Sequence, residues 1–222
     1  MKRRATISEV SALFAALFLV SACASGPPRE KGPFRAPDLV ELVSIDSTIR
    51  LDVRYATSNN FIGRPLYREA RAFLQRPAAE ALSRVSAKLR EKGYGLVVFD
   101  GYRPWSVTKL FWDLTPPGQR DFVANPKNGS RHNRGCAVDL SLYDLATGEP
   151  VAMPSDYDDF SELAYPDFAG GTVEEREHRD LLRSSMESEG FTVYRYEWWH
   201  FDYRDWREYP ILNEPFERIG IR

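Results

Sequence analysis

The sequence predicts a single α+β domain in which helices flank a mainly antiparallel sheet. Three observations lead to this fold class: helix and strand patterns are mixed along the chain, the strand patterns are short, and no strand–helix–strand unit repeats. The chain has 222 residues, of which 43% are hydrophobic and 28% are charged, and this suits one packed domain. The net charge of −2 shows no excess of basic residues of the kind that nucleic-acid-binding proteins carry, so we expect no nucleic-acid partner.

The first 22 residues have the anatomy of an export signal. Lys2-Arg3-Arg4 begins it, and an apolar run over residues 10–20 is too short for a spanning helix of roughly 20 apolar residues. The run ends at Val20-Ser21-Ala22-Cys23, which resembles the lipobox of bacterial lipoproteins, where cleavage leaves a lipidated cysteine. We therefore expect an exported protein anchored through lipid on Cys23 to the periplasmic face of a membrane. The alternative is an ordinary cleavable signal.

The residue after Cys23 bears on the choice of membrane. It is Ala24 and not aspartate, which by resemblance to the sorting rule of Gram-negative lipoproteins favours the outer membrane. Residues 23–37 are expected to be the lipidated N-terminus and a tether, because four prolines and two glycines disfavour regular structure. The folded domain is expected over residues 38–222. If Cys23 carries lipid, Cys136 is the other cysteine of the mature chain, and no intramolecular disulfide is expected.

The first half of the domain contains two strand patterns and two helix patterns. Apolar and polar residues alternate from Ile49 to Tyr55, which predicts a half-buried strand, and residues 96–99 form a short apolar strand. The clearest helix pattern runs from Pro77 to Lys92, with an apolar stripe and Gly93 as its C-terminal cap. A shorter helix is expected from Trp105 to about Leu114, where two prolines follow.

The second half begins with an alternating segment. Ala137, Asp139 and Ser141 are expected on one face of a strand, and the apolar residues between them on the other face. Residues 150–171 lack periodicity and predict a long functional loop. A third helix is expected from Val173 to Glu189, and the aromatic-rich segment from Phe191 to Tyr203 is predicted to be one strand.

His132, Asp139 and His200 are the candidate metal ligands. His132 stands in the loop seven positions before Asp139, and zinc binds imidazole nitrogen and carboxylate oxygen at roughly 2.0–2.2 Å. Because the chain has only three histidines, His200 is the candidate third ligand, which leaves one position open, as in catalytic zinc sites. His178 lies in a charged helical stretch and is expected on the solvated surface. The alternative is that the ligand candidates make ordinary hydrogen bonds.

Glu197 and Arg103 are the candidate catalytic side chains. A carboxylate such as Glu197 can take a proton from attacking water, and Arg103 offers a fork of donors suited to a carboxylate or an oxyanion. In an ideal strand, residues three apart face opposite sides, so Glu197 reaches His200 only from a preceding turn or through a bulge. The alternatives are an incidental glutamate in an aromatic core strand and a structural salt bridge of the arginine.

Three segments together resemble a known enzyme family. They are Asp100-Gly101-Tyr102-Arg103-Pro104, Ser130-x-His132-x-x-Gly135-x-Ala137-x-Asp139 and Glu197-Trp198-Trp199-His200. In this order they closely resemble the D-alanyl-D-alanine dipeptidases of the VanX type, zinc peptidases that share a fold with D,D-carboxypeptidases. The resemblance runs from about Leu39 to about Pro210. Two features depart from the pattern: Cys136 replaces a small residue such as serine, and the family's resistance enzymes are cytosolic and carry no lipoprotein signal.

The resemblance implies a role for each matching position. One zinc ion per chain would be bound by His132, Asp139 and His200. Glu197 would be the catalytic base, and Arg103 would steady the tetrahedral intermediate. The positions that match substrate-contacting groups of the family are Ser130, Tyr55 and Asp158.

The expected reaction is zinc-dependent hydrolysis of D-Ala-D-Ala and related short D-dipeptides, with Glu197 as base. Export makes salvage of D-alanine from cell-wall peptides the expected role, because an exported enzyme cannot deplete a cytosolic precursor pool. One alternative is a D,D-carboxypeptidase or endopeptidase that acts on longer peptidoglycan peptides with the same metal site. Another, from a different class, is a wall-binding lipoprotein without turnover.

Overall fold

The computed structural model describes residues 26–220, and Cys23 and the expected export signal lie outside this range. The strands are β1 (Leu39–Glu41), β2 (Arg50–Leu51), β3 (Phe73–Gln75), β4 (Tyr94–Asp100), β5 (Ala137–Asp144), β6 (Phe191–Tyr194) and β7 (Glu197–Tyr203). The α-helices are α1 (Leu42–Ile45), α2 (Arg76–Arg90), α3 (Trp105–Leu114) and α4 (Val173–Glu187). No helix within this range is long and apolar enough to cross a membrane.

The main sheet has five strands in the order β2-β4-β5-β7-β6. The β2–β4 pairing is parallel, and the pairings β4–β5, β5–β7 and β6–β7 are antiparallel. Strands β1 and β3 form a separate small antiparallel sheet. The predicted α+β fold with a mainly antiparallel sheet is confirmed.

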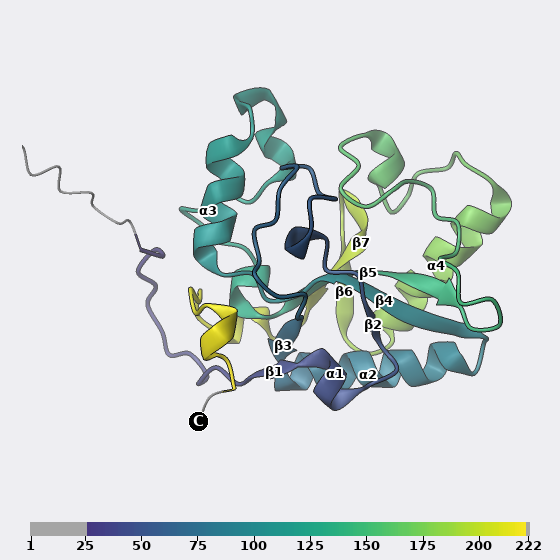
Figure 1. The fold of residues 1–222 in the computed structure, drawn as a ribbon, viewed down its shortest axis with the longest axis horizontal. Helices are drawn as coiled ribbons and strands as arrows, with labels where there is room; N and C mark the ends of the chain where they lie inside the picture. Colours follow the sequence, from purple (N-terminus) through teal and green to yellow (C-terminus); the bar gives the residue numbers. More distant parts are fainter. Residues whose placement is uncertain (1–25, 221–222) are drawn as a thin grey trace, which may run out of the picture.

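The helices lie on two sides of the main sheet. Helices α2 and α4 pack on each other and against strands of the sheet. Figure 1 shows α2 below the sheet, and α3 and the loop of residues 150–171 above it. The predicted functional side chains share a cavity with Phe111 of α3 and with Asp158 and Phe160 of this loop, so the site lies on the face of the sheet opposite α2 (Figure 1).

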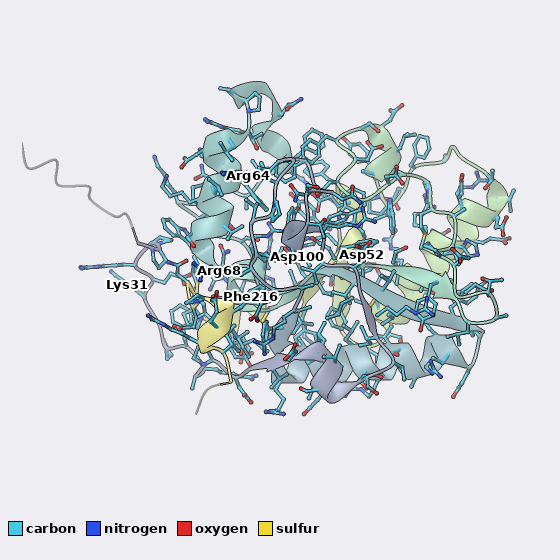
Figure 2. All side chains as sticks on the ribbon, viewed as in Figure 1. Lys31, Asp52, Arg64, Arg68, Asp100 and Phe216 are labelled. Carbon is cyan, nitrogen blue, oxygen red and sulfur yellow. The ribbon has the colours of Figure 1, made fainter. Side chains whose placement is uncertain are left out.

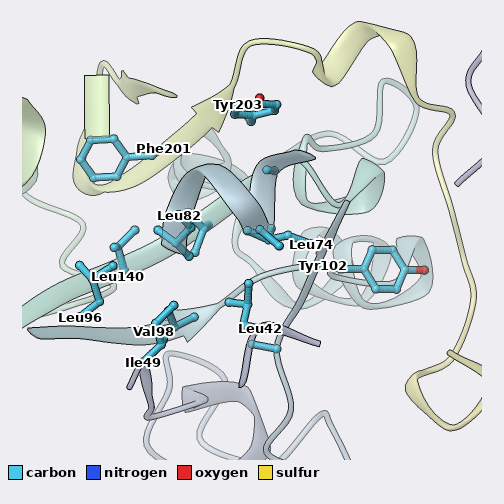
Figure 3. Close-up of a cluster of buried hydrophobic side chains, with 14 of the residues drawn as sticks. Leu42, Ile49, Leu74, Leu82, Leu96, Val98, Tyr102, Leu140, Phe201 and Tyr203 are labelled. Atoms are coloured by element: carbon cyan, nitrogen blue, oxygen red, sulfur yellow. The ribbon is translucent and has the colours of Figure 1, made fainter. Parts of the chain in front are cut away.

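Helix α2 builds much of that core. Its predicted apolar stripe is fully buried, and the stripe consists of Ala78, Ala81, Leu82, Val85 and Leu89. Figure 3 shows Leu82 in one cluster with side chains of β4 and β5. Burying one leucine of this kind stabilises the fold by roughly 1.5–3 kcal/mol.

The three long helices match their predicted ranges within two residues at each end. Gly93 follows α2 with a φ of +89°, the left-handed conformation expected of a C-terminal cap. Helix α4 begins with a capping box in which Thr172 and Glu175 satisfy each other's backbone N–H groups. Strands β4 and β5 also form where the apolar and alternating patterns predict them.

Two strand predictions are wrong in extent. The alternation over residues 49–55 gives only the two-residue strand β2, after which the chain forms a 3-10 turn at Arg54–Ala56. This turn buries Tyr55 against Phe61 and Phe111, and that aromatic packing outweighs the strand pattern.

The segment predicted as one strand from Phe191 to Tyr203 is a hairpin. Strands β6 and β7 are joined by a turn at Arg195 and Tyr196. These residues carry none of the glycine, asparagine or proline signals that mark a hairpin turn, so the sequence pattern does not reveal it.

The exposed position predicted for His178 is wrong as well. The residue is 8% exposed, its Nδ1–H donates to the carbonyl oxygen of Ala152 at 3.0 Å, and it packs on Tyr94. His178, Leu182 and Met186 are spaced four apart and form the buried stripe of α4. In the sequence His178 lies among charged residues, so the apolar spacing of this stripe does not stand out.

Residues 26–37, expected as part of a tether, form neither helix nor strand and are fastened to the domain at two points. The Glu30 carboxylate accepts hydrogen bonds from the Arg134 guanidinium and, at 2.7 Å, from the Ile211 backbone N–H. The Arg35 guanidinium forms an ion pair with the Glu208 carboxylate at 2.5 Å, and the Arg35 backbone N–H donates to the Glu208 carbonyl oxygen. Between these two points Lys31 projects away from the domain (Figure 2).

Candidate active site

Three segments bring the predicted metal ligands together. His132 lies on a single 3-10 turn, Asp139 on β5 and His200 on β7. The register of β5 and β7 places Asp139 directly opposite His200. The turn that returns His132 towards β5 ends at Gly135, whose φ is +67°. L side chains rarely adopt this left-handed conformation, and a Cβ here would also lie 3.3 Å from the Gln75 backbone nitrogen, so the turn favours glycine.

The three ligand atoms surround a common point. His132 Nε2 lies 3.3 Å and His200 Nδ1 lies 3.0 Å from Asp139 Oδ1, and the two nitrogens are 3.1 Å apart. Ligands bound at about 2.0–2.1 Å to a tetrahedral zinc ion stand about 3.3 Å from one another. Among the described residues, Asp139 Oδ1 is buried and has no hydrogen-bond partner, which suits an atom whose partner is a cation. The donor set therefore fits zinc.

The outward-facing nitrogens of both histidines are held by the protein. His132 Nδ1–H donates to the carbonyl oxygen of Gly101 at 2.7 Å, and His200 Nε2–H donates to Asp202 Oδ1 at 3.0 Å. The other oxygen of Asp202 lies 3.3 Å from Arg131 Nε. Such partners fix the tautomer and the orientation of a ligating imidazole. Each histidine therefore presents its second nitrogen, unprotonated when a metal is bound, to the common point.

The charges of the ligand cluster are strongly coupled. Burial alone would raise the pKa of Asp139, but His132 and His200 outweigh it and hold the pKa far below its usual range. Burial alone would lower the pKa of His200, but the neighbouring carboxylates of Asp139 and Asp202 raise it to about 10. Binding of a metal at His200 therefore releases a proton.

Glu197 is the first residue of β7 and lies beside the ligand cluster. Its carboxylate is 3.6 Å from His200 Nδ1. The β6–β7 register shifts between Val193 and Tyr194, so the bulge expected from the three-residue spacing is present next to Glu197. Burial raises the pKa of Glu197 to about 7, partly offset by the nearby charges of His200 and Arg103. A carboxyl group with such a pKa can exchange protons near neutral pH.

Arg103 faces the same cluster and is fixed by Asp100. Two of its nitrogens lie 2.9 and 2.8 Å from Asp100 Oδ2, and a third distance, from Nη2 to Asp139 Oδ2, is 3.7 Å. Its guanidinium also stacks over the rings of Phe111 and Tyr55. The salt bridge weighed as the alternative role therefore exists, and it aims the guanidinium at the ligand cluster. Asp100 lies near the centre of the molecule (Figure 2).

The predicted substrate-contacting residues line the same cavity. Tyr55 donates its hydroxyl hydrogen to Asp158, with oxygen distances of 3.1 and 3.2 Å. Among the described residues other than glycine, Asp158 alone has a positive φ, of 62°, a conformation that costs energy and is typical of functional positions. Ser130 accepts a hydrogen bond from the His132 backbone N–H at 3.2 Å.

The charged form of Asp158 is destabilised by its surroundings. Burial and the neighbouring Asp139 carboxylate raise the pKa of Asp158 well above its usual value, and Arg103 offsets this only in part. A carboxylate held in this way gains from an incoming cation, such as the ammonium group of a peptide.

The cavity itself is small. It has a volume of about 260 Å³, and pockets for drug-sized ligands measure roughly 300–1,000 Å³. Its lining contains the predicted metal ligands, Glu197 and Arg103, and also Tyr55, Ser130 and Asp158. Phe122 and Phe160 line it too, and their stacked rings, with centroids 5.0 Å apart, join the segment after α3 to the loop of residues 150–171. This enclosure suits a ligand of few atoms.

Three residues of the site were assigned no role by sequence reasoning. Asp100 fixes Arg103, Asp202 fixes His200, and Tyr157 donates to Asp139 Oδ2 at 3.0 Å. Asp202 stands two residues after His200, where the strand period places it on the same face, so this signal was available. The position of Tyr157 depends on how the loop of residues 150–171 folds over the sheet, and no local sequence pattern predicts that path.

Comparisons with known proteins agree with this geometry. The chain matches the peptidase M15 family, described as D-Ala-D-Ala dipeptidase, over residues 35–218. It is 34% identical to the D-alanyl-D-alanine dipeptidase of Enterococcus faecalis (strain ATCC 700802 / V583), covering 76% of this chain and 88% of that protein. It is 31% identical to the D-alanyl-D-alanine dipeptidase of Escherichia coli (strain K12), covering 81% of this chain and 91% of that protein.

Solved structures match at lower identity, and the LdcB LD-carboxypeptidase is one of them. The LdcB LD-carboxypeptidase is 22% identical, with a TM-score of 0.45, over 78% of this chain and 71% of that chain. The length of the family match and the identity to both dipeptidases show that this chain belongs to the peptidase M15 family of D-Ala-D-Ala dipeptidases.

Proposed function

We propose that this peptidase is a zinc-dependent dipeptidase that hydrolyses D-Ala-D-Ala and related short D-dipeptides. The observation that carries the proposal is the convergence of a three-ligand cluster, a buried glutamate and a fixed arginine on one small cavity. Two relatives that carry the name D-alanyl-D-alanine dipeptidase, matched over most of their length, support the choice of substrate.

His132, Asp139 and His200 would hold the zinc ion, which supplies Lewis acidity towards water and the amide carbonyl. Glu197 accepts the proton of the attacking water and later returns it to the leaving amine, because its pKa of about 7 allows both transfers. Arg103, aimed by Asp100, donates hydrogen bonds to the oxygen that gains negative charge.

The walls of the cavity suit the two ends of a free dipeptide. Asp158 offers a carboxylate for the ammonium group, and Tyr55 holds this carboxylate in place. Ser130 offers a hydroxyl for the substrate carboxylate. The small volume supports a free dipeptide over a longer wall peptide. A comparison of free D-Ala-D-Ala with a tripeptide that ends in D-Ala-D-Ala tests this choice, and faster cleavage of the tripeptide would favour the carboxypeptidase alternative.

The Glu197→Gln variant tests the assignment of the base. We expect zinc to remain bound and hydrolysis of D-Ala-D-Ala to fall by roughly 10²–10⁴-fold, the usual contribution of a general base. Glu174→Gln, at the exposed start of α4, is the matched control and should keep full activity. Full activity of Glu197→Gln would refute the proposed reaction.

We propose further that the protein is an exported lipoprotein, anchored through Cys23 at the periplasmic face of the outer membrane, and that it salvages D-alanine. The support is the sequence of the export signal, since Cys23 lies outside the described residues. Metabolic labelling with palmitate should label the wild type and leave Cys23→Ala unlabelled. An unlabelled, cytosolic wild type would contradict the proposal.

A further inference from the structure

A groove beside α3 lies where the chain leaves the domain towards Cys23. We call it the α3 groove. It has a volume of about 560 Å³ and shares only Asn125 with the lining of the catalytic cavity. Its lining residues are Gly26, Pro28, Trp105, Lys109, Trp112, Asp113, Asn125, Pro126 and Lys127.

The attachment of residues 26–37 makes this position significant. A free tether from Cys23 to Asp38 would let the domain stand about 50 Å from its anchor. Glu30 and Arg35 are instead bound to the domain, so the free length is set by the residues before them. Gly26 follows Cys23 by three positions in the sequence, a span of at most about 11 Å.

This short reach brings the α3 groove to the lipid surface. The polar headgroup layer of one leaflet is roughly 5–8 Å thick. A lipidated Cys23 would therefore hold Gly26 inside this headgroup layer or no farther above it than about one further layer thickness. Gly26 lines the groove, and the face of the domain nearest to the anchor is therefore the face that carries α3.

The chemistry of the groove suits this environment. Trp112 is partly exposed, Leu114 is 47% exposed, and the Arg120 guanidinium lies 4.8 Å from the centre of the Trp112 ring. Exposed Lys127 adds a further positive charge at the edge of the groove. Tryptophan rings and long basic side chains are the groups that proteins place at the boundary between lipid headgroups and acyl chains.

We propose that the α3 groove and the neighbouring Leu114 form a membrane-docking surface, which holds the domain against the bilayer that carries the lipidated Cys23. The proposal rests on the lipidation proposed above. Because Asn125 lines both the groove and the catalytic cavity, docking places the cavity one loop away from the lipid surface.

The test uses the full mature lipoprotein in vesicles of phosphatidylethanolamine and phosphatidylglycerol, with and without brominated acyl chains. Brominated lipid should quench the tryptophan fluorescence of the wild type. Trp112→Phe should lose most of this quenching, and Lys127→Glu should reduce it at low salt. Lys92→Glu, at an exposed position in the turn after α2, is the matched charge control and should leave the quenching unchanged.

Hydrogen exchange on the same samples gives a second measurement. Relative to Cys23→Ala in solution, amides of residues 105–114 and 124–128 should exchange at least about tenfold more slowly in vesicles, and those of residues 76–90 should be unchanged. Equal quenching in wild type and Trp112→Phe, or protection confined to α2, would overturn the docking surface. Protection of residues 105–114 by wall glycan fragments without vesicles would overturn it too.

The activity of each sample separates the two proposals. Trp112-dependent quenching without hydrolysis of D-Ala-D-Ala would contradict the dipeptidase and leave the docking surface standing. Hydrolysis without palmitate labelling would contradict the docking surface and leave the dipeptidase standing.

Discussion

Removal of the Asp202 carboxylate should weaken zinc binding without touching any ligand. Asp202 Oδ1 accepts the His200 Nε2–H at 3.0 Å, and Asp202 Oδ2 lies 3.3 Å from Arg131 Nε. The side chain of Asp202 is only 14% exposed, so solvent replaces the lost acceptor poorly. Loss of such a partner typically costs 10- to 100-fold in metal affinity, or about 1.4–2.8 kcal/mol.

The size of the effect should depend on the replacement. Asp202→Ala removes both contacts and should approach the hundredfold limit, whereas Asp202→Asn keeps one acceptor oxygen and should stay near tenfold. The assay is a competition titration of the chelated protein with zinc and a fluorescent zinc indicator at pH 7.5. Asp205→Asn is the control, because Asp205 pairs with Arg35 and makes no contact with a ligand. A zinc Kd of Asp202→Ala within threefold of wild type would refute the orienting role.

Three further predictions concern stability and substrate binding. Burial raises the pKa of Glu197 from 4.5 to about 7, so between these pH values the folded state binds one proton more than the unfolded state, and its stability falls as pH rises. The free energy of unfolding of chelated Glu197→Gln, measured with denaturant, should therefore equal that of chelated wild type below about pH 4.5. Above pH 7 it should exceed the wild-type value by up to about 3 kcal/mol. Asp158→Asn should raise the KM for D-Ala-D-Ala about thirtyfold, because it removes roughly 2 kcal/mol of binding free energy between the carboxylate and the substrate ammonium group. The KM for an N-acetylated substrate, which has no ammonium group, should change little. Equal effects on both substrates would contradict the ammonium contact. Leu82→Ala should destabilise the fold by about 2–5 kcal/mol in the same unfolding assay, and a loss below about 1 kcal/mol would contradict its place in the core.

The helices and central strands could be predicted because their patterns are local. The α2 stripe and Gly93 define one helix from start to end, and the alternation around Asp139 defines β5. The hairpin of β6 and β7 could not be predicted in this way. The pairing of the two strands shifts register next to the turn at Arg195 and Tyr196, and the local sequence contains no turn signal.

The same distinction separates the parts of the site. His132, Asp139, His200 and Glu197 could be proposed from residue type, spacing and family resemblance, and the fold brings all of them together. Tyr157 could not, because it reaches Asp139 only when residues 150–171 fold over the sheet. The burial of His178 was missed because the apolar stripe of α4 lies among charged neighbours.

The pairing of Asp139 with His200 makes the proposed zinc site depend on correct strand alignment. A slip of one residue between β5 and β7 would turn either side chain to the opposite face of the sheet. A molecule with this misalignment would place Val138 and Phe201 on opposite faces of the sheet and would separate Asp139 from His200, so the three predicted zinc ligands would no longer meet. The bound zinc stoichiometry of a purified preparation therefore counts the molecules whose central strands have aligned correctly, independently of any catalytic assay.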